Sequence, residues 1–152
     1  MSHQDKLLEC WQMIRMCYKI WGTEWYKQNP SGLSITQVQL LELLDKEGRQ
    51  KASQLAGALF ITTGGFTGIA DRLVKAGLVE RVKDEQDRRT VYLELTEEGR
   101  SELARVVEQR KELLNRLFGV LSEKDVSELQ RMLNTFYEHY RNTIEPQGKL
   151  ND

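Results

Sequence analysis

Residues Leu78–Leu95 read LVERVKDEQDRRTVYLEL, and this stretch decides the fold. Apolar and polar residues alternate on both sides of a charged centre, and this period of two is typical of β-strands. The centre, Asp84–Arg89, holds no Asn-Gly or Asp-Gly pair, so the connection is longer than a two-residue turn and is expected to project. The sequence therefore predicts a β-hairpin with a charged tip exposed to solvent.

Two short helical patterns precede the hairpin, between Ala52 and Gly77. The segment Ile61–Gly65, rich in threonine and glycine, joins them, which is the form of a helix-turn-helix. A hairpin directly after it makes a winged helix. The second helix begins with small side chains and hydroxyl groups, which can enter a major groove and offer N–H groups to phosphate. The expected DNA contacts are Ser53, Thr62, Thr63, Gly64, Gly65, Thr67 and Arg72, with Arg88 and Arg89 at the hairpin tip.

The alternative for this second helix is a linker weakened by its glycines, each of which costs about 1 kcal/mol relative to alanine. Upstream of it, Ser34 or Thr36 is expected to cap a scaffold helix that ends near Gly48.

Composition argues against several other classes of protein. The chain has 152 residues, of which 30% are charged, and no apolar run approaches the roughly 18 residues of a membrane span. The first residues lack a signal-peptide pattern, so we expect a cytoplasmic protein without a membrane partner, in which Cys10 and Cys17 are reduced. Metal-ligand spacings, phosphate loops and nucleophile motifs are missing from the sequence, so neither a cofactor nor enzymatic activity is expected.

Apolar stripes with spacings of three and four residues mark both ends of the chain. A winged helix offers these stripes little to pack against, so the sequence predicts that they pair across the two-fold axis of a homodimer. An intramolecular bundle is the alternative. The stripes are Leu7, Trp11, Ile14, Tyr18, Trp21 and Trp25 near the start, and Val126, Leu129, Leu133, Phe136 and Tyr140 near the end.

The predicted fold class is therefore mainly α-helical with a small β-hairpin wing. The expected domains are an N-terminal dimerisation helix in residues 1–33, a winged helix-turn-helix in residues 34–99 and C-terminal dimerisation helices in residues 100–152.

Three motifs resemble the MarR (multiple antibiotic resistance regulator) family of bacterial winged-helix transcriptional regulators. They are the run Gly65–Arg81, the triplet Asp87–Arg89, and Leu95–Gly99. The resemblance implies a homodimer on double-stranded DNA, in which Arg89, and secondarily Arg88, enters the minor groove. It also implies that Asp71 and Asp87 orient that arginine. The chain departs from the pattern at Gly68, where family members often carry Arg or Lys, so one base contact of the family is not expected here.

We therefore expect a repressor that binds a pseudo-palindromic operator and is released by a small aromatic or amphipathic effector. Trp11, Tyr18, Trp21 and Trp25 are the candidate ligand wall.

Two alternatives stay open. Cys10 and Cys17 are either small buried residues or peroxide-sensing thiols of a repressor with the same fold. A winged helix can also bind protein instead of DNA, although adjacent arginines at the tip favour DNA because a minor groove attracts guanidinium groups.

Overall fold

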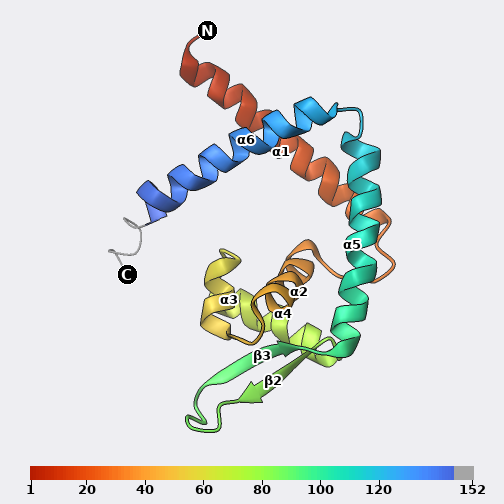
Figure 1. Cartoon of the computed structure of the whole chain (residues 1–152), viewed down its shortest axis with the longest axis vertical. Helices are drawn as coiled ribbons and strands as arrows, with labels where there is room; N and C mark the ends of the chain where they lie inside the picture. The colour runs from red at the N-terminus through yellow and green to blue at the C-terminus, as the bar shows by residue number, and fades with distance from the viewer. Residues whose placement is uncertain (146–152) are drawn as a thin grey trace. The chain divides into compact units, whose positions relative to one another are not determined.

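The computed structural model describes residues 1–145 and confirms a mainly helical chain with a small antiparallel sheet (Figure 1). The last seven residues of the predicted C-terminal region, 146–152, lie outside the described residues. The elements are α1 (His3–Lys27), α2 (Ile35–Glu47), β1 (Gln50–Lys51), α3 (Ala52–Ala58), α4 (Thr63–Lys75), β2 (Val79–Lys83), β3 (Val91–Leu95), α5 (Glu97–Phe118), α6 (Glu123–His139) and the π-helical turn Tyr140–Ile144.

The described chain divides into two compact units, Met1–Leu113 and the part from Leu114 onward. The division falls inside α5. The first unit holds α1, the winged helix and most of α5, and the second holds the end of α5 and α6. The predicted domain boundaries at residues 33 and 99 stay a prediction.

Reciprocal hydrogen bonds at serine set the start of α2. The backbone N–H of Gln37 donates to Ser34 Oγ at 3.1 Å, and the N–H of Ser34 donates to Gln37 Oε1 at 2.8 Å. This capping box satisfies two N–H groups that the helix would leave unpaired. Ser34, and not Thr36, is therefore the cap, because Ser34 has extended backbone angles and accepts from the Gln37 N–H, whereas Thr36 lies inside the helix. Gly48, with φ +74°, ends the helix.

The sheet has three strands in the order β1-β3-β2, with both pairs antiparallel. The register sets Arg81 of β2 opposite Leu93 of β3, and Gln50 of β1 opposite the same leucine. The predicted hairpin is confirmed, whereas β1 was not predicted. It has two residues, too few for an alternating pattern to show.

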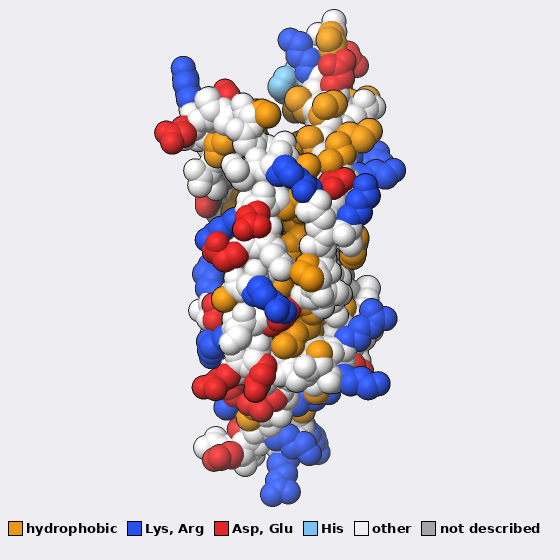
Figure 2. All heavy atoms as spheres, turned by 90° about the vertical axis from the view of Figure 1, so that its right-hand side faces the viewer, with side chains coloured by type: hydrophobic (Ala, Val, Ile, Leu, Met, Phe, Trp, Pro, Cys, Tyr) orange, Lys and Arg blue, Asp and Glu red, His pale blue; other side chains and the backbone are white. Residues whose placement is uncertain are grey.

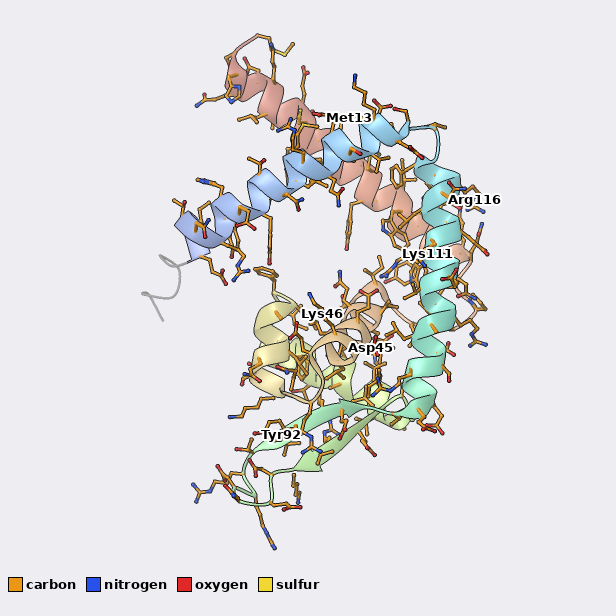
Figure 3. The ribbon with its side chains drawn as sticks, in the orientation of Figure 1. Met13, Asp45, Lys46, Tyr92, Lys111 and Arg116 are labelled. Atoms are coloured by element: carbon orange, nitrogen blue, oxygen red, sulfur yellow. The ribbon has the colours of Figure 1, made fainter. Side chains whose placement is uncertain are left out.

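The core of the winged helix lies between α2, α4, the sheet and the first turns of α5. Its fully buried side chains include Leu40, Leu41 and Leu44 of α2, Leu73 of α4, Leu93 of β3 and Val106 of α5. Ion pairs at the surface add a second link between α2 and α5. Arg100 Nη1 lies 3.1 Å from Asp45 Oδ1, whose place on α2 is labelled in Figure 3, and Arg110 pairs with Glu42.

Thr96 connects the start of α5 to the turn between α4 and β2. Its hydroxyl donates to the carbonyl of Gly77 at 2.7 Å and accepts from the N–H of Gly99 at 2.9 Å. Its own N–H donates to the carbonyl of Leu78 at 3.1 Å. The wing and the helix that leaves it are therefore held to α4 by a small set of directed hydrogen bonds.

The helices at the two ends of the chain expose most of their apolar side chains. On α1 only Trp25 is buried, while Trp11, Met13 and Tyr18 are more than half exposed. No residue of α6, which is described throughout, is buried, and Phe136 is 65% exposed. Figure 2 shows apolar side chains gathered at the surface where the N-terminal part of α1 lies. The predicted apolar stripes are thus largely exposed in the single chain, except for the buried Trp25 and the half-buried Trp21 and Tyr140.

Within residues 1–145, no helix combines the length and the apolar character that crossing a bilayer would require.

Replacing Gly99 with alanine should destabilise the winged helix. An added Cβ would lie 2.1 Å from the Leu78 carbonyl oxygen and 2.7 Å from Leu95 Cδ1, and Gly99 is buried, so the backbone of the turn must shift. We expect a loss of about 1 to 3 kcal/mol in the free energy of unfolding, measured by urea denaturation.

The matched control is Gly22→Ala on α1, where an added Cβ meets only Ile35 Cδ1 at 4.0 Å. This variant should gain up to about 1 kcal/mol, because alanine is the better helix former. Equal stabilities of the two variants would contradict the packing described for Gly99.

Candidate nucleic-acid interface

Helix α4 separates a packing face from an exposed face of small residues. Phe66, Ala70 and Leu73 are buried against the winged-helix core. Ile69 and Val74 are half-buried and the other positions of the helix are exposed, which confirms the two-faced pattern predicted from the sequence. The exposed residues are Thr63, Gly64, Gly65, Thr67, Gly68, Asp71, Arg72 and Lys75, and the capping residue Thr62 adjoins them.

The hydroxyl groups at the start of α4 keep part of their hydrogen-bonding capacity. Thr62 Oγ1 accepts from the N–H of Gly65 at 3.1 Å, which leaves its proton free to donate to another molecule. Thr67 Oγ1 donates to the carbonyl of Thr63 at 3.0 Å, so its oxygen can still accept. Phe66 donates the first intrahelical bond, to Thr62, so the N–H groups of Thr63 and Gly64 precede the ladder. These groups suit base edges and phosphate.

Two glycines of this face, Gly64 and Gly68, are not explained by packing. No described atom lies within 4 Å of a Cβ added to Gly64 or Gly68. Glycine inside a helix costs about 1 kcal/mol relative to alanine, so Gly68 lowers the stability of α4 without relieving any contact. Glycine is found where another backbone approaches closely, and a bare helix surface of this kind allows a partner to come near.

The tip of the wing is shaped by the side chain of Asp87. Its Oδ1 accepts from the N–H of Arg89 at 3.1 Å, and its Oδ2 accepts from the Thr90 hydroxyl at 3.2 Å. The N–H of Asp84 donates to the carbonyl of Thr90 at 3.1 Å and closes the loop. Arg88 and Arg89 are therefore presented from a folded turn with their side chains exposed. Figure 2 shows Lys and Arg side chains at the lower end of the view, where Figure 1 places the hairpin.

Asp71 does not pair with the residue that the family resemblance implied. Its Oδ1 accepts a hydrogen bond from Arg81 Nη2, in an ion pair between α4 and β2, whereas Arg89 was expected. The reason is the register. Arg81 lies opposite Leu93, on the sheet face that packs toward α4, while Arg89 lies in the loop beyond both strands. Asp87 does contact Arg89, but through the main-chain N–H.

The opposite face of the sheet carries residues that sequence reasoning missed. The Arg49 guanidinium and the Lys51 ammonium lie 5.9 and 6.0 Å from the ring centroid of Tyr92, which Figure 3 labels on the hairpin. Arg49 also pairs with Glu94 at 3.2 Å, and the Tyr92 hydroxyl lies 3.4 Å from Asp84. These contacts fasten β1 to β3. The alternation of Tyr92 and Glu94 was the available signal, but it could not reveal that Arg49 and Lys51 lie opposite.

The proposed ligand wall on α1 divides into a buried and an exposed part. Trp25 is 2% exposed, and its Nε1 donates to the carbonyl of Leu33 at 3.1 Å, so its side chain is not accessible to a ligand in the single chain, and its place in the ligand wall stays a prediction. Trp21 packs edge-on against Trp25, with centroids 5.2 Å apart, and is half-buried. The turn after α1 brings Leu33 back to this end of the helix, which explains the burial. Trp11 and Tyr18 remain exposed and line a shallow groove with Ile14 and Arg15.

The two cysteines differ in exposure. Cys10 is exposed and Cys17 is half-buried in the single chain, so the interpretation of both as small buried residues does not hold for Cys10. Its position among the exposed residues of α1 explains this, because none of residues 1–145 covers that part of the helix.

Comparisons with known proteins agree with this architecture. The MarR family model matches residues 33–91. The HTH-type transcriptional regulator PecS of Dickeya dadantii is 34% identical over 113 residues, 72% of this chain and 68% of PecS. The HTH-type transcriptional regulator YfiV of Bacillus subtilis, itself uncharacterised, is 33% identical over 103 residues, 68% of this chain and 62% of YfiV. The chain thus spans less than two thirds of YfiV.

Among solved structures, the transcriptional regulator BldR from Sulfolobus solfataricus is similar over 91% of this chain and 99% of BldR. The TM-score is 0.77 and the sequence identity 28%. The likeness includes the helices at both ends as well as the winged helix, because the match covers nearly the whole of both chains.

Replacing Gly68 with alanine should raise stability and lower binding to duplex DNA. The methyl group meets no described atom, so the free energy of unfolding should rise by up to about 1 kcal/mol. If this face enters a groove, the same methyl group displaces the duplex and affinity falls about tenfold, or about 1.4 kcal/mol. Gly64→Ala should act in the same direction on binding, with a smaller gain in stability because it lies in the first turn.

Gly57→Ala on α3 is the matched control, since its added Cβ also meets nothing within 4 Å of the described atoms. It should change stability alone. Unchanged DNA affinity in the Gly68 variant would show that this face of α4 does not contact DNA.

Proposed function

The chain belongs to the MarR family of winged-helix transcriptional regulators, and from this premise we propose that it binds a specific duplex DNA operator as a homodimer and represses transcription there. The observation that carries the proposal is the bare, hydroxyl-rich face of α4, which lies in one compact unit with a wing whose tip presents Arg88 and Arg89. A winged helix reads DNA by placing such a helix in the major groove.

The residues of the interface divide into two roles. The N–H groups of Thr63 and Gly64 and the hydroxyl of Thr62 lie at the helix start, where the helix dipole favours an anionic phosphate. Thr67 and Arg72 follow along the exposed face, where they can meet base edges. We expect Arg89 to enter a minor groove, which attracts guanidinium groups when it is narrow, and the hydrogen bond from its N–H to Asp87 supports this role. The net charge of the chain is −1, so attraction to DNA depends on these local cations.

The homodimer is supported by the exposed apolar faces of α1 and α6. Each buried square ångström of apolar surface is worth about 25 cal/mol, and side chains such as Phe136 and Leu133 are more than half exposed in the single chain. A two-fold axis lets the same faces of two copies cover each other. Such a dimer carries two winged helices, and a regulator of this kind represses by occupying promoter DNA.

An effector that releases the DNA must bind more tightly to a dimer in which the two winged helices no longer match the spacing of the two half-sites. The loss of operator affinity is limited by this difference in the affinity for the effector. The exposed Trp11 and Tyr18 on α1 suit a small aromatic or amphipathic molecule. The exposure of Cys10 supports an alternative, in which oxidation of this thiol releases the operator.

Selection of bound fragments from the source genome tests the proposal. The recovered operator should be a pseudo-palindrome with half-site centres about 10 bp apart, because two recognition helices on a two-fold axis repeat with one turn of the duplex. Affinity should fall steeply with salt as phosphate contacts release counterions. Recovery of a single unrepeated half-site would contradict the dimeric mode. Binding that does not depend on salt would favour the module that binds protein instead of DNA.

The effector class is tested by adding phenolic acids or organic hydroperoxides to the operator complex. We expect a phenolic acid to lower operator affinity by about 5- to 150-fold, the ordinary range of allosteric coupling. Fluorescence of the exposed Trp11 should respond, measured in Trp25→Phe to remove the buried reporter. The variant with Cys10→Ser and Cys17→Ser should behave like the parent. Release by hydroperoxide alone, lost in that variant, would establish the thiol mechanism instead.

A further inference from the structure

We infer that Arg81 is a positioning residue for DNA recognition, which fixes the wing against the recognition helix α4 through its ion pair with Asp71. The inference rests on the proposed function, in which α4 and the wing contact one duplex. It assigns a role to two charged residues, neither of which needs to touch a base.

The register of the sheet makes Arg81 unusual. Opposite residues of an antiparallel pair share a face, and the pair on one side of it, Val79 and Leu95, is buried on the face toward α4. Arg81 lies opposite the buried Leu93, so alternation calls for an apolar residue there. The sequence instead places a guanidinium at this point, and it reaches across to the carboxylate of Asp71.

Asp71 is equally unusual on its own element. It lies one helical turn after Thr67 and one before Lys75, on the exposed face proposed to approach DNA. A bare carboxylate there would repel phosphate. The ion pair compensates this charge and leaves Arg72 and Lys75 to attract the duplex.

Stability of the fold does not explain the pair. Its two side chains are 43% and 57% exposed, and exposed pairs contribute between zero and about 1 kcal/mol. Fixing the wing in position relative to α4 is therefore the better explanation for this ion pair.

The wing needs a contact at its root, where β2 adjoins α4, because its outer part consists of only two strands. Strand β1 pairs with β3 only as far as Lys51 and Tyr92, so beyond Tyr92 the wing is a two-stranded ribbon. Isolated ribbons of this kind are marginally stable. The direction of Arg89 at the tip then depends on how the root is held, and the ion pair joins β2 directly to α4. Holding both elements in the bound arrangement reduces the cost of ordering them on DNA.

The test uses the full-length chain and the duplex that the parent recovers by in vitro selection. Asp71→Ala should lower affinity for that duplex about tenfold, although it removes a negative charge from the DNA face. Arg81→Ala should cause a similar loss, and the double variant should lose no more than either single variant, because both remove one contact. Exchanging the two residues, Asp71→Arg with Arg81→Asp, should restore part of the affinity.

Three controls separate positioning from simple charge. Glu85→Gln removes a negative charge at the wing tip and should leave affinity equal or higher. Arg89→Ala removes a proposed DNA contact and should reduce the slope of affinity against salt by about 1. Arg81→Ala should leave that slope as in the parent. Affinity for a random-sequence duplex should be unchanged or higher in Asp71→Ala, and its unfolding midpoint should stay near that of the parent.

Parent-like or tighter operator binding by Asp71→Ala would overturn the inference, as would additive losses in the double variant. A reduced salt slope in Arg81→Ala would make Arg81 a phosphate contact instead. If the parent selects no duplex at all, the proposed function fails, and the inference falls with it.

Discussion

Apolar side chains on α1 and α6 that the single chain leaves in water are the constraint on which the rest of the molecule depends. A fold of this size normally buries large aromatic residues, yet Trp11, Tyr18 and Phe136 are all more than half exposed. These faces are regular helical stripes, so a matching helix can cover them. In the dimer that we propose, covering them brings two winged helices together, which is the arrangement that a symmetric DNA site requires.

The winged helix itself does not need a second chain to cover its core. Leucines of α2, α4 and β3 close its core, and Thr96 and Gly99 hold the wing, α4 and α5 together over short distances. The stability of this core can offset a local loss of stability on the exposed face of α4. Gly68 lowers helix stability and relieves no contact, and functional surfaces commonly show such local costs.

The sequence was sufficient where a local pattern determines the structure. Alternation predicted β2 and β3, and apolar spacing predicted the long helices. For the cap of α2 the sequence left Ser34 and Thr36 open, and the structure identifies Ser34. The sequence was insufficient where a contact depends on which segments lie side by side in the folded chain. Strand β1 is too short for a pattern, and the pairing of Asp71 with Arg81 depends on the sheet register. The burial of Trp25 depends on a turn that returns the chain to α1.

The most direct test of the account is the number of chains in solution and on the operator. Sedimentation velocity at micromolar concentration should give a dimer for the parent, and the selected duplex should bind two chains. Phe136→Asp with Leu133→Asp, both on the exposed face of α6, should sediment as a folded monomer with weakened operator binding. A parent that is monomeric alone and binds the duplex as one chain would contradict the account.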